Sequence, residues 1–433
     1  MTINSLLIIS FFFIFSCTSF TSTEAYEPLN RDGNITIKWD AIKWTPDGYV
    51  AVVTISNFYK YRHIEAPGWL LGWTWRNKEV IWNMIGAQTT KQGNCSRFKG
   101  SNNIPHSCEK NPIVVDLLPE TPYNQQIANC CKGGVISSPV SDPQNSASSF
   151  QLTVGAAGTT NKTVYLPKNF TLKTPPGPGY ICGPAKVVRP TRFISSDGRR
   201  VTQAMMTWEV ICVAYLQVAA EDTRSCCVSL SSDYNNTITP CPTCSCGCQN
   251  NKNRHGNCVD HHKSMPLKNN NNSSAPIVQC TDHMCPTQVH WHIVKANEKK
   301  YWRVKIKVTN LNYIMNSSQW NLEVVQRPNF DHKLIKISSF NYKKFNFSSR
   351  RNSTSVLMMW GVKKKNDVII GAAGSFDGGK NYVESEVLFK KEKMNLALEK
   401  GWGFPIRVYF NGDRCVMPPL DAYPYLQDTI TSL

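Results

Sequence analysis

The sequence predicts a mainly β fold, in which two related β-sandwich-like domains flank a Cys-rich centre stapled by disulfides. Strand-like runs of Val, Ile, Thr, Tyr and Trp recur along the 433 residues, whereas apolar residues at helical spacing are scarce. A pattern of Trp, strand and Asn occurs once towards each end of the chain. Most of the 17 Cys lie between the two copies. These observations divide the chain into a leader, two β domains and a Cys-rich centre.

Residues 1–25 are predicted to be a secretory signal peptide. An apolar run extends from Leu6 to Phe15, interrupted only by Ser10, and small residues follow it up to Ala25. Such a run is too short to span a bilayer comfortably, because a membrane helix needs about 20 apolar residues. We expect cleavage after Ala25.

Glycosylation signals and Cys content agree with secretion. Ten Asn-x-Ser/Thr sequons give a density that suits a secreted glycoprotein. The predicted sites are Asn34, Asn94, Asn161, Asn169, Asn235, Asn271, Asn272, Asn316, Asn346 and Asn352. Removal of Cys17 with the leader leaves an even 16 Cys, whose pairing the sequence does not give. The disulfide candidates are Cys95, Cys108, Cys130, Cys131, Cys182, Cys212, Cys226, Cys227, Cys241, Cys244, Cys246, Cys248, Cys258, Cys280, Cys285 and Cys415.

The N-terminal domain is expected over residues 26–178, as a β-sandwich of the carbohydrate-binding-module type. The turn signal Pro46-Asp47-Gly48 precedes a strand-like run from Tyr49 to Phe58. Further short strands and turns follow, which is the pattern of a sandwich. The Pro- and Gly-rich stretch 175–179 marks the boundary.

The central region is expected over residues 179–286, with an exposed polar loop from Asn250 to Ser274. The Cys spacing between Cys241 and Cys248 is compatible with zinc, but disulfides are favoured in an oxidising compartment. Neither a metal nor a cofactor is therefore expected. Adjacent Cys rarely bond to each other, so each member of the pairs at 130–131 and 226–227 is expected to bond elsewhere.

The C-terminal domain is expected over residues 287–433. The run from Tyr301 to Thr309 alternates, which predicts a half-buried strand with a basic outer face formed by Arg303, Lys305 and Lys307.

The two β domains are predicted to be copies of one unit. Trp39 precedes Asn57 by 18 residues, and Trp291 precedes Asn310 by 19 residues, with a strand in each interval. Further Trp residues follow both strands, and the sequence therefore indicates an internal duplication.

Several longer motifs carry a specific resemblance. They include Gly33-Asn34-Ile35-Thr36-Ile37-Lys38-Trp39-Asp40, Ala66-Pro67-Gly68-Trp69, Gly72-Trp73-Thr74-Trp75, the stretch from Asn124 to Gly134, Cys226-Cys227-Val228-Ser229, His283-Met284-Cys285-Pro286 and Tyr409-Phe410-Asn411-Gly412-Asp413. Together they cover essentially the whole mature chain, and by them the protein resembles the plant COBRA-like proteins.

The resemblance implies a cellulose-binding N-terminal region, a Cys-rich centre and a role in orienting or assembling cellulose microfibrils in the cell wall. Family members typically carry a glycosylphosphatidylinositol anchor at the outer plasma membrane, which needs a hydrophobic tail. Residues from Ala422 to Leu433 contain no such tail, so a freely secreted protein and a truncated reading frame both stay open. Ser107 stands where the family pattern suggests a Cys beside Cys108, which puts the local disulfide in doubt.

Aromatic side chains are the predicted polysaccharide-binding residues. Flat rings can stack on the apolar faces of cellulose chains while nearby polar groups bind hydroxyls. The candidates are Trp44, Trp69, Trp73, Trp75, Trp82, Tyr59 and Tyr61. Tryptophan is also usually buried, so each candidate has a core role as its alternative, and Trp39 is expected in the core.

Catalysis is not expected. Glu79, Asp116 and Glu120 are carboxylates of the kind that glycosidases use, but nothing in their sequence context singles them out. The formal net charge of +18 supports an alternative function, a basic scaffold or adhesin at the membrane–wall boundary that binds pectin or proteins. Raised salt should abolish pectin binding but spare stacking on cellulose.

Overall fold

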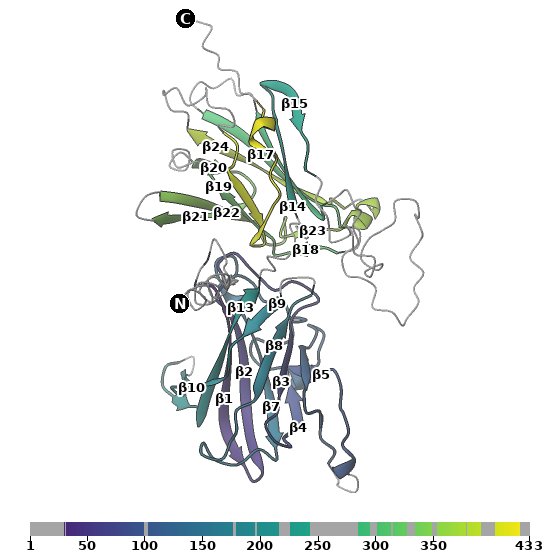
Figure 1. Ribbon diagram of the computed structural model, residues 1–433, viewed down its shortest axis with the longest axis vertical. Helices are drawn as coiled ribbons and strands as arrows, with labels where there is room; N and C mark the ends of the chain where they lie inside the picture. The colour runs from purple at the N-terminus through teal and green to yellow at the C-terminus, as the bar shows by residue number, and fades with distance from the viewer. Residues whose placement is uncertain are drawn as a thin grey trace, which may run out of the picture.

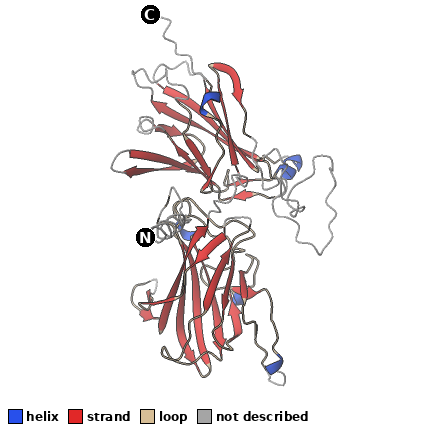
Figure 2. Cartoon of the chain, in the orientation of Figure 1, coloured by secondary structure: helices blue, strands red, loops and turns tan. Residues whose placement is uncertain are grey.

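The computed structural model describes residues 30, 32–98, 103–175, 179–194, 197–215, 226–242, 285–294, 301–312, 315–326, 334–348, 353–377, 379–390 and 403–424. These residues are mainly β-strand, and their helices are short 3-10 turns (Figure 2). The predicted fold class is confirmed. The predicted leader, the loop 250–274 and residues 425–433 lie outside the described residues. No helix among the described residues is long and apolar enough to cross a membrane.

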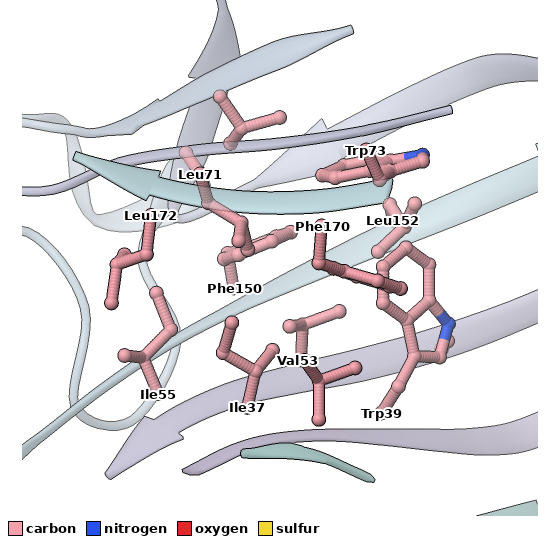
Figure 3. Packing of buried hydrophobic residues seen from close by; sticks show 14 of the residues in the cluster. Ile37, Trp39, Val53, Ile55, Leu71, Trp73, Phe150, Leu152, Phe170 and Leu172 are labelled. Carbon is pink, nitrogen blue, oxygen red and sulfur yellow. The ribbon is translucent and has the colours of Figure 1, made fainter. Parts of the chain in front are cut away.

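An 11-stranded sheet builds the N-terminal half. Its strands are β1 (Ile35–Thr45), β2 (Gly48–Asn57), β3 (Leu70–Thr74), β4 (Val80–Ile85), β5 (Ala87–Thr89), β6 (Ile113–Asp116), β7 (Ala147–Gly155), β8 (Lys168–Lys173), β9 (Gly179–Cys182), β10 (Lys186–Val188) and β13 (Met206–Tyr215). The order is β4-β7-β2-β1-β13-β9-β8-β3-β6-β5, with β10 beside β13. The sheet folds over, so that β1, β2 and β7 face β3 and β8 across one core (Figures 1 and 3).

The core of this half is aromatic and aliphatic. Alternate residues of β1 and β2 are buried, including Ile37 and Trp39 on β1 and Val53 on β2, as strand periodicity predicts. Trp39 stacks on Trp208 of β13 with ring centroids 5.5 Å apart. The expected core position of Trp39 is confirmed.

The C-terminal half contains two larger sheets. The first has the order β15 (Asn235–Thr239), β14 (Cys226–Ser232), β16 (Thr287–Val294), β17 (Tyr301–Asn310), β24 (Tyr382–Lys390) and β20 (Leu334–Ile337). The second has the order β21 (Asn341–Ser348), β22 (Ser353–Trp360), β19 (Asn321–Val325), β25 (Arg407–Phe410) and β26 (Asp413–Arg414). Two short hairpins complete the strands: β11 (Arg192–Ile194) with β12 (Val201–Gln203), and β18 (Ser317–Ser318) with β23 (Val368–Ile369).

The sheets cross the domain boundaries that the sequence predicted. Strands β9 and β13 pair within the N-terminal sheet, although residues 179–215 were assigned to the Cys-rich centre. Strand β14 pairs in parallel with β16 and therefore belongs to the C-terminal half. Cys density was a poor guide here, because disulfides also lie inside these sheets.

The predicted internal duplication is supported by one repeated hydrogen-bond pattern. The Asn57 amide donates to the carbonyls of Arg62 and Ser137 and accepts the backbone N–H of Tyr59. Asn310 makes the matching set, donating to Met315 and Ile369 and accepting from Asn312. Both Asn residues end the second strand of a central antiparallel hairpin, whose first strand carries a fully buried Trp.

The two halves touch through polar and aromatic contacts. Arg62, whose side chain is 3% exposed, pairs with Asp413 at 3.0 Å. The Ser137 hydroxyl donates to the Gln319 amide oxygen at 2.6 Å. Tyr61 packs edge-to-face on Phe345 with centroids 5.3 Å apart.

Five disulfides join described residues. They are Cys95–Cys108, Cys130–Cys131, Cys182–Cys212, Cys226–Cys415 and Cys227–Cys241. Cys285 is also disulfide-bonded. Cys244, Cys246, Cys248, Cys258 and Cys280 lie outside the described residues.

The adjacent Cys pairs behave differently from each other. Cys226 and Cys227 bond elsewhere, as predicted, because alternate residues of a strand point to opposite faces. Cys130 and Cys131 bond to each other, so that prediction is wrong for this pair. They lie in a loop rather than a strand, and the left-handed backbone at Cys131 (φ 66°) accompanies the bond.

Candidate functional site

Most of the predicted aromatic platform is in the interior. Five of the seven candidates are at most 2% exposed: Tyr59, Tyr61, Trp69, Trp73 and Trp75. A ring without solvent contact has no face to offer a polymer, so the prediction is wrong for these five. Trp73 and Trp75 do share a face, as their spacing predicted, and both pack edge-to-face against Trp39. That shared face is the interior of the sandwich, where Figure 3 shows Trp73 beside Trp39.

The two buried tyrosines have structural roles. The Tyr59 hydroxyl accepts the backbone N–H of Ala214 at 2.7 Å, which ties the end of β2 to β13. Tyr61 belongs to a small apolar cluster with Val325 and Tyr409 of the C-terminal half. Burial raises the pKa of Tyr61 far above its ordinary value, and the nearby Glu323 carboxylate adds to the effect.

Trp44 and Trp82 are the predicted binding residues that keep exposed surface. Trp44 is the penultimate residue of β1 and packs edge-to-face on Tyr49 across the hairpin. Trp82 lies at an irregularity in β4, where its indole N–H donates to the Asp47 carboxylate at 3.3 Å. Both rings are thus half-buried and held by neighbours, which lowers the entropy that stacking on a ligand would cost.

Strand register brings these two rings to one end of the sandwich. Trp44 pairs with Tyr49 on β2, Tyr49 pairs with Val154 on β7, and Val154 pairs with Ile81 beside Trp82. Three strand spacings separate the two backbones, which is about 14 Å. The hairpin turn at this end is remote from the C-terminal half (Figure 1).

Close packing fixes Trp82 at this end. A Cβ added to Gly155 would lie 2.0 Å from the Trp82 indole nitrogen and 2.8 Å from an Asp47 carboxylate oxygen. Glycine is therefore needed for the ring to lie over the backbone. Phe98 packs edge-to-face on Trp82 at 5.1 Å, and the Arg97 guanidinium lies 4.8 Å from the Phe98 centroid.

A separate hollow of about 580 Å³ lies beside β8 and β9. Its lining includes Arg76, Lys168 and Tyr165, and the Arg76 guanidinium sits 5.1 Å from the Tyr165 centroid. The Asn169 sequon lies on the same lining. A glycan at Asn169 would stand at this hollow.

The predicted basic face of β17 is largely neutralised. Its inward residues are buried, as predicted. Arg303 pairs with Glu386 at 3.9 Å and Lys305 with Glu384 at 3.1 Å. Lys307 lies 4.0 Å from the centroid of the Tyr382 ring. Cross-strand neighbours on β24 thus offset the charge that the sequence alone presents.

A line of hydrogen bonds along β14 and β16 was not predicted. The His292 ring joins Asp233 at 2.9 Å and Ser231 at 2.7 Å, while His290 joins Ser231 at 2.8 Å and Ser229 at 2.7 Å. If His292 donates to Asp233, the Ser231 hydroxyl can donate to His292 and the Ser229 hydroxyl to His290. Ser231 is 5% exposed, so the line serves to hold the two strands together.

The three carboxylates considered in the sequence lie in different surroundings. The Asp116 carboxylate accepts three backbone N–H groups, and Glu79 is buried and accepts the N–H of Asn77. Glu120 is exposed. Within the described ranges, no group of three or more His, Cys, Asp or Glu is placed to hold a metal ion.

The described sequons are accessible. Asn94, Asn161, Asn169 and Asn316 are exposed and Asn34 is half-exposed. Asn271, Asn272 and Asn352 lie outside the described residues, as do the side chains of Asn235 and Asn346. Ser107 takes the place of the expected Cys and hydrogen-bonds Lys91, while Cys108 pairs with Cys95.

Comparisons with known proteins cover both halves of the chain. The model described as "COBRA N-terminal domain" matches residues 49–215, and that of the "COBRA family C-terminal domain" matches residues 225–424. "Protein COBRA" of Arabidopsis thaliana is 60% identical over 96% of this chain and 89% of its own length. "COBRA-like protein 1" of Oryza sativa subsp. japonica is 58% identical over 100% of this chain and 93% of its own.

Proposed function

The chain belongs to the COBRA family, and we propose that it is a non-catalytic, cellulose-binding extracellular glycoprotein that helps to orient or assemble cellulose microfibrils. Its N-terminal half is a β-sandwich with a continuous buried core, and its described sequons are accessible. Secretion would supply the oxidising compartment that its disulfides require.

The half-exposed Trp82 is the single observation that carries the proposal. Its ring is pinned by Asp47, Phe98 and the bare backbone of Gly155, yet it retains open surface at the free end of the sandwich. A fixed aromatic ring can stack on the apolar face of a sugar ring without first being ordered. Trp44, three strands away, would provide the second contact.

Retention on microcrystalline cellulose tests the proposal. The glycosylated, secreted protein should stay with the solid and release no sugars. Trp82→Ala and Trp44→Ala should weaken retention, whereas Tyr342→Ala, which removes an exposed ring of the C-terminal half, should not. Wild-type protein that remains in the supernatant, or retention that survives loss of both Trp rings, would refute the proposal.

A second candidate function, binding of acidic pectin, is favoured by the β11–β12 hairpin. Each residue of both strands is exposed, and Arg192, Arg199 and Arg200 lie on or beside them. The hairpin is a small two-stranded sheet, and its three Arg residues are exposed. A basic surface of this kind attracts polyanions.

Ionic strength separates the two candidates. Pectin binding should fall steeply between low and physiological salt and should weaken when Arg192, Arg199 and Arg200 become Gln, because exposed charges are screened. Stacking on cellulose should persist in both cases. A pectin affinity that changes neither with salt nor with these substitutions would refute pectin binding by this hairpin.

A further inference from the structure

The loop between β6 and β7 presents the most exposed aromatic ring among the described residues. Within this segment, called here the Tyr123 loop (residues 117–134), Tyr123 is 90% exposed and Leu118 is 65% exposed. One exposed apolar side chain is common on a protein surface, so the case for a contact surface depends on what surrounds these two and on how the backbone beneath them is held.

A single carboxylate fixes one end of the loop. Asp116 accepts the backbone N–H groups of Cys131 at 2.9 Å, Lys132 at 2.9 Å and Gly134 at 2.8 Å. A Cβ added to Gly134 would lie 2.7 Å from the backbone nitrogen of Trp69, so the loop packs directly against the segment before β3. The loop is therefore anchored on the sandwich.

The turn at Cys130 and Cys131 constrains the backbone at this same end of the loop. The two Cys are bonded to each other, and Asn129 and Cys131 both have φ of 66°. Non-glycine residues rarely adopt this left-handed backbone, and such residues cluster at ligand-binding segments. The Asn129 carbonyl also accepts the N–H of Ser149 on β7 at 3.3 Å.

The chemistry of the presented surface is neutral. Residues 121–129 read Thr-Pro-Tyr-Asn-Gln-Gln-Ile-Ala-Asn and contain no charged side chain, in a protein of net charge +18. Tyr123, Asn124, Gln125 and Gln126 are all exposed. An aromatic face suits the axial C–H groups of a sugar ring, and amides both donate to and accept from hydroxyls.

The loop also lies on the same edge of the sandwich as Trp82. The Gly86 N–H donates to the Gln125 carbonyl at 2.9 Å, and a Cβ at Gly86 would lie 3.0 Å from that of Cys130. Trp82 and Gly86 are four residues apart along edge strand β4 and its end, which is about 13 Å of extended chain.

We propose that the Tyr123 loop is a second polysaccharide contact, which binds an uncharged, extended glucan chain that also reaches Trp82 along the β4 edge. The inference rests on the proposed cellulose-binding function and adds a specific residue set to it. Two weak contacts on one polymer reinforce each other because the second binds at a high effective concentration. A protein partner is the competing occupant, and the assay separates it from a glucan.

Binding isotherms of the secreted protein on microcrystalline cellulose and on soluble cello-oligosaccharides test the loop. Tyr123→Ala should lower the association constant roughly three- to ten-fold, the loss expected for one aromatic contact. Tyr123→Phe keeps the ring and should bind nearly as wild type. Tyr165→Ala is the matched control, because it removes another exposed Tyr ring, at the hollow beside β8.

The outcomes separate a failure of the loop contact from a failure of the proposed cellulose-binding function. If wild type binds and Trp82→Ala weakens binding while Tyr123→Ala does not, the loop contact is overturned and cellulose binding stands. An equal loss in Tyr165→Ala would also overturn it, because the effect would not be local. If wild type binds neither ligand, the proposed function and the loop contact both fall.

The adjacent disulfide has its own test. Changing Cys130 and Cys131 together to Ser removes the cross-link without leaving an unpaired thiol, and it leaves Tyr123 in place. Amide exchange in residues 121–129 should accelerate, and glucan affinity should fall as in Tyr123→Ala, with little change in thermal midpoint. Unchanged affinity with accelerated exchange would show that binding does not depend on the fixed backbone.

Discussion

Replacing Trp69 with Ala separates a core role from a binding role. The side chain is 1% exposed and stacks on Phe150 with centroids 5.8 Å apart and planes 25° from parallel. Its indole N–H has no acceptor among the described residues. Truncation should therefore leave a large cavity beside Phe150, and it should remove no ligand contact.

The expected magnitude is large. Truncating a buried Trp to Ala costs about 3–5 kcal/mol of unfolding free energy, including the cavity. For a unit of the size of the N-terminal half, about 2–4 °C of thermal midpoint accompanies each kcal/mol, so the midpoint should fall by about 6–20 °C. Trp69→Phe retains the ring contact and removes the unpaired donor, so its cost should stay below about 1.5 kcal/mol.

Calorimetry and cellulose retention, measured on the same preparations, test whether Trp69 has a core role or a binding role. Below its lowered midpoint, folded Trp69→Ala protein should be retained as well as wild type. Trp82→Ala should show the reverse, with a stability change within about 1 kcal/mol and weaker retention. A Trp69→Ala protein of wild-type stability that no longer binds cellulose would refute the placement of this ring in the core.

Three other substitutions probe the site, the junction and a titrating group. Gly155→Ala should displace the Trp82 ring and weaken cellulose retention with a modest loss of stability, which binding and fluorescence spectra would report. Asp413→Ala should remove the 3.0 Å ion pair of the buried Arg62 side chain and lower the unfolding midpoint by more than the loss of an exposed pair would, as calorimetry can measure. Burial, helped by neighbouring His292 and Lys307 charges, lowers the pKa of His290 below 6.5. The unfolded state therefore binds the proton more readily than the folded state. The contribution of His290 to the free energy of unfolding is fully present above pH 6.5 and is lost as the pH falls below it. His290→Gln should make the free energy of unfolding depend less on pH, as denaturant titrations at a series of pH values would measure.

The sequence predicted the local periodicity well because periodicity follows from backbone geometry. The alternation of β17 and the common face of Trp73 and Trp75 both hold in the structure. Alternation does not show which face of a strand points into the core. That depends on the second layer of the sandwich, which is formed by strands far away in the chain.

The proposed Tyr123 contact was harder to predict because its residues carry no strong local signal. Tyr123 lies in a stretch that reads as an ordinary polar turn, and only the contacts of Asp116 and the Cys130–Cys131 bond show that this turn is fixed. The three basic residues on β17 were misleading because their acidic partners are also distant in the sequence. These partners, Glu384 and Glu386, lie about 80 residues further along the chain.

The two halves share a framework but differ in the surfaces that they present. Asn57 and Asn310 hold equivalent turns, so both copies kept the groups that support the hairpin. Their neighbours differ, because β1 is flanked by the antiparallel strand β13 and β16 by the parallel strand β14, and the half-buried His–Ser line joins β14 to β16. On the N-terminal half, Trp82 is half-buried and Tyr123 is exposed, and both lie along the β4 edge. The proposed polysaccharide contacts therefore lie on the first copy. Loss of binding should accompany changes on the β4 edge and should spare the outer face of β17, where each of the three basic side chains already meets a partner from β24.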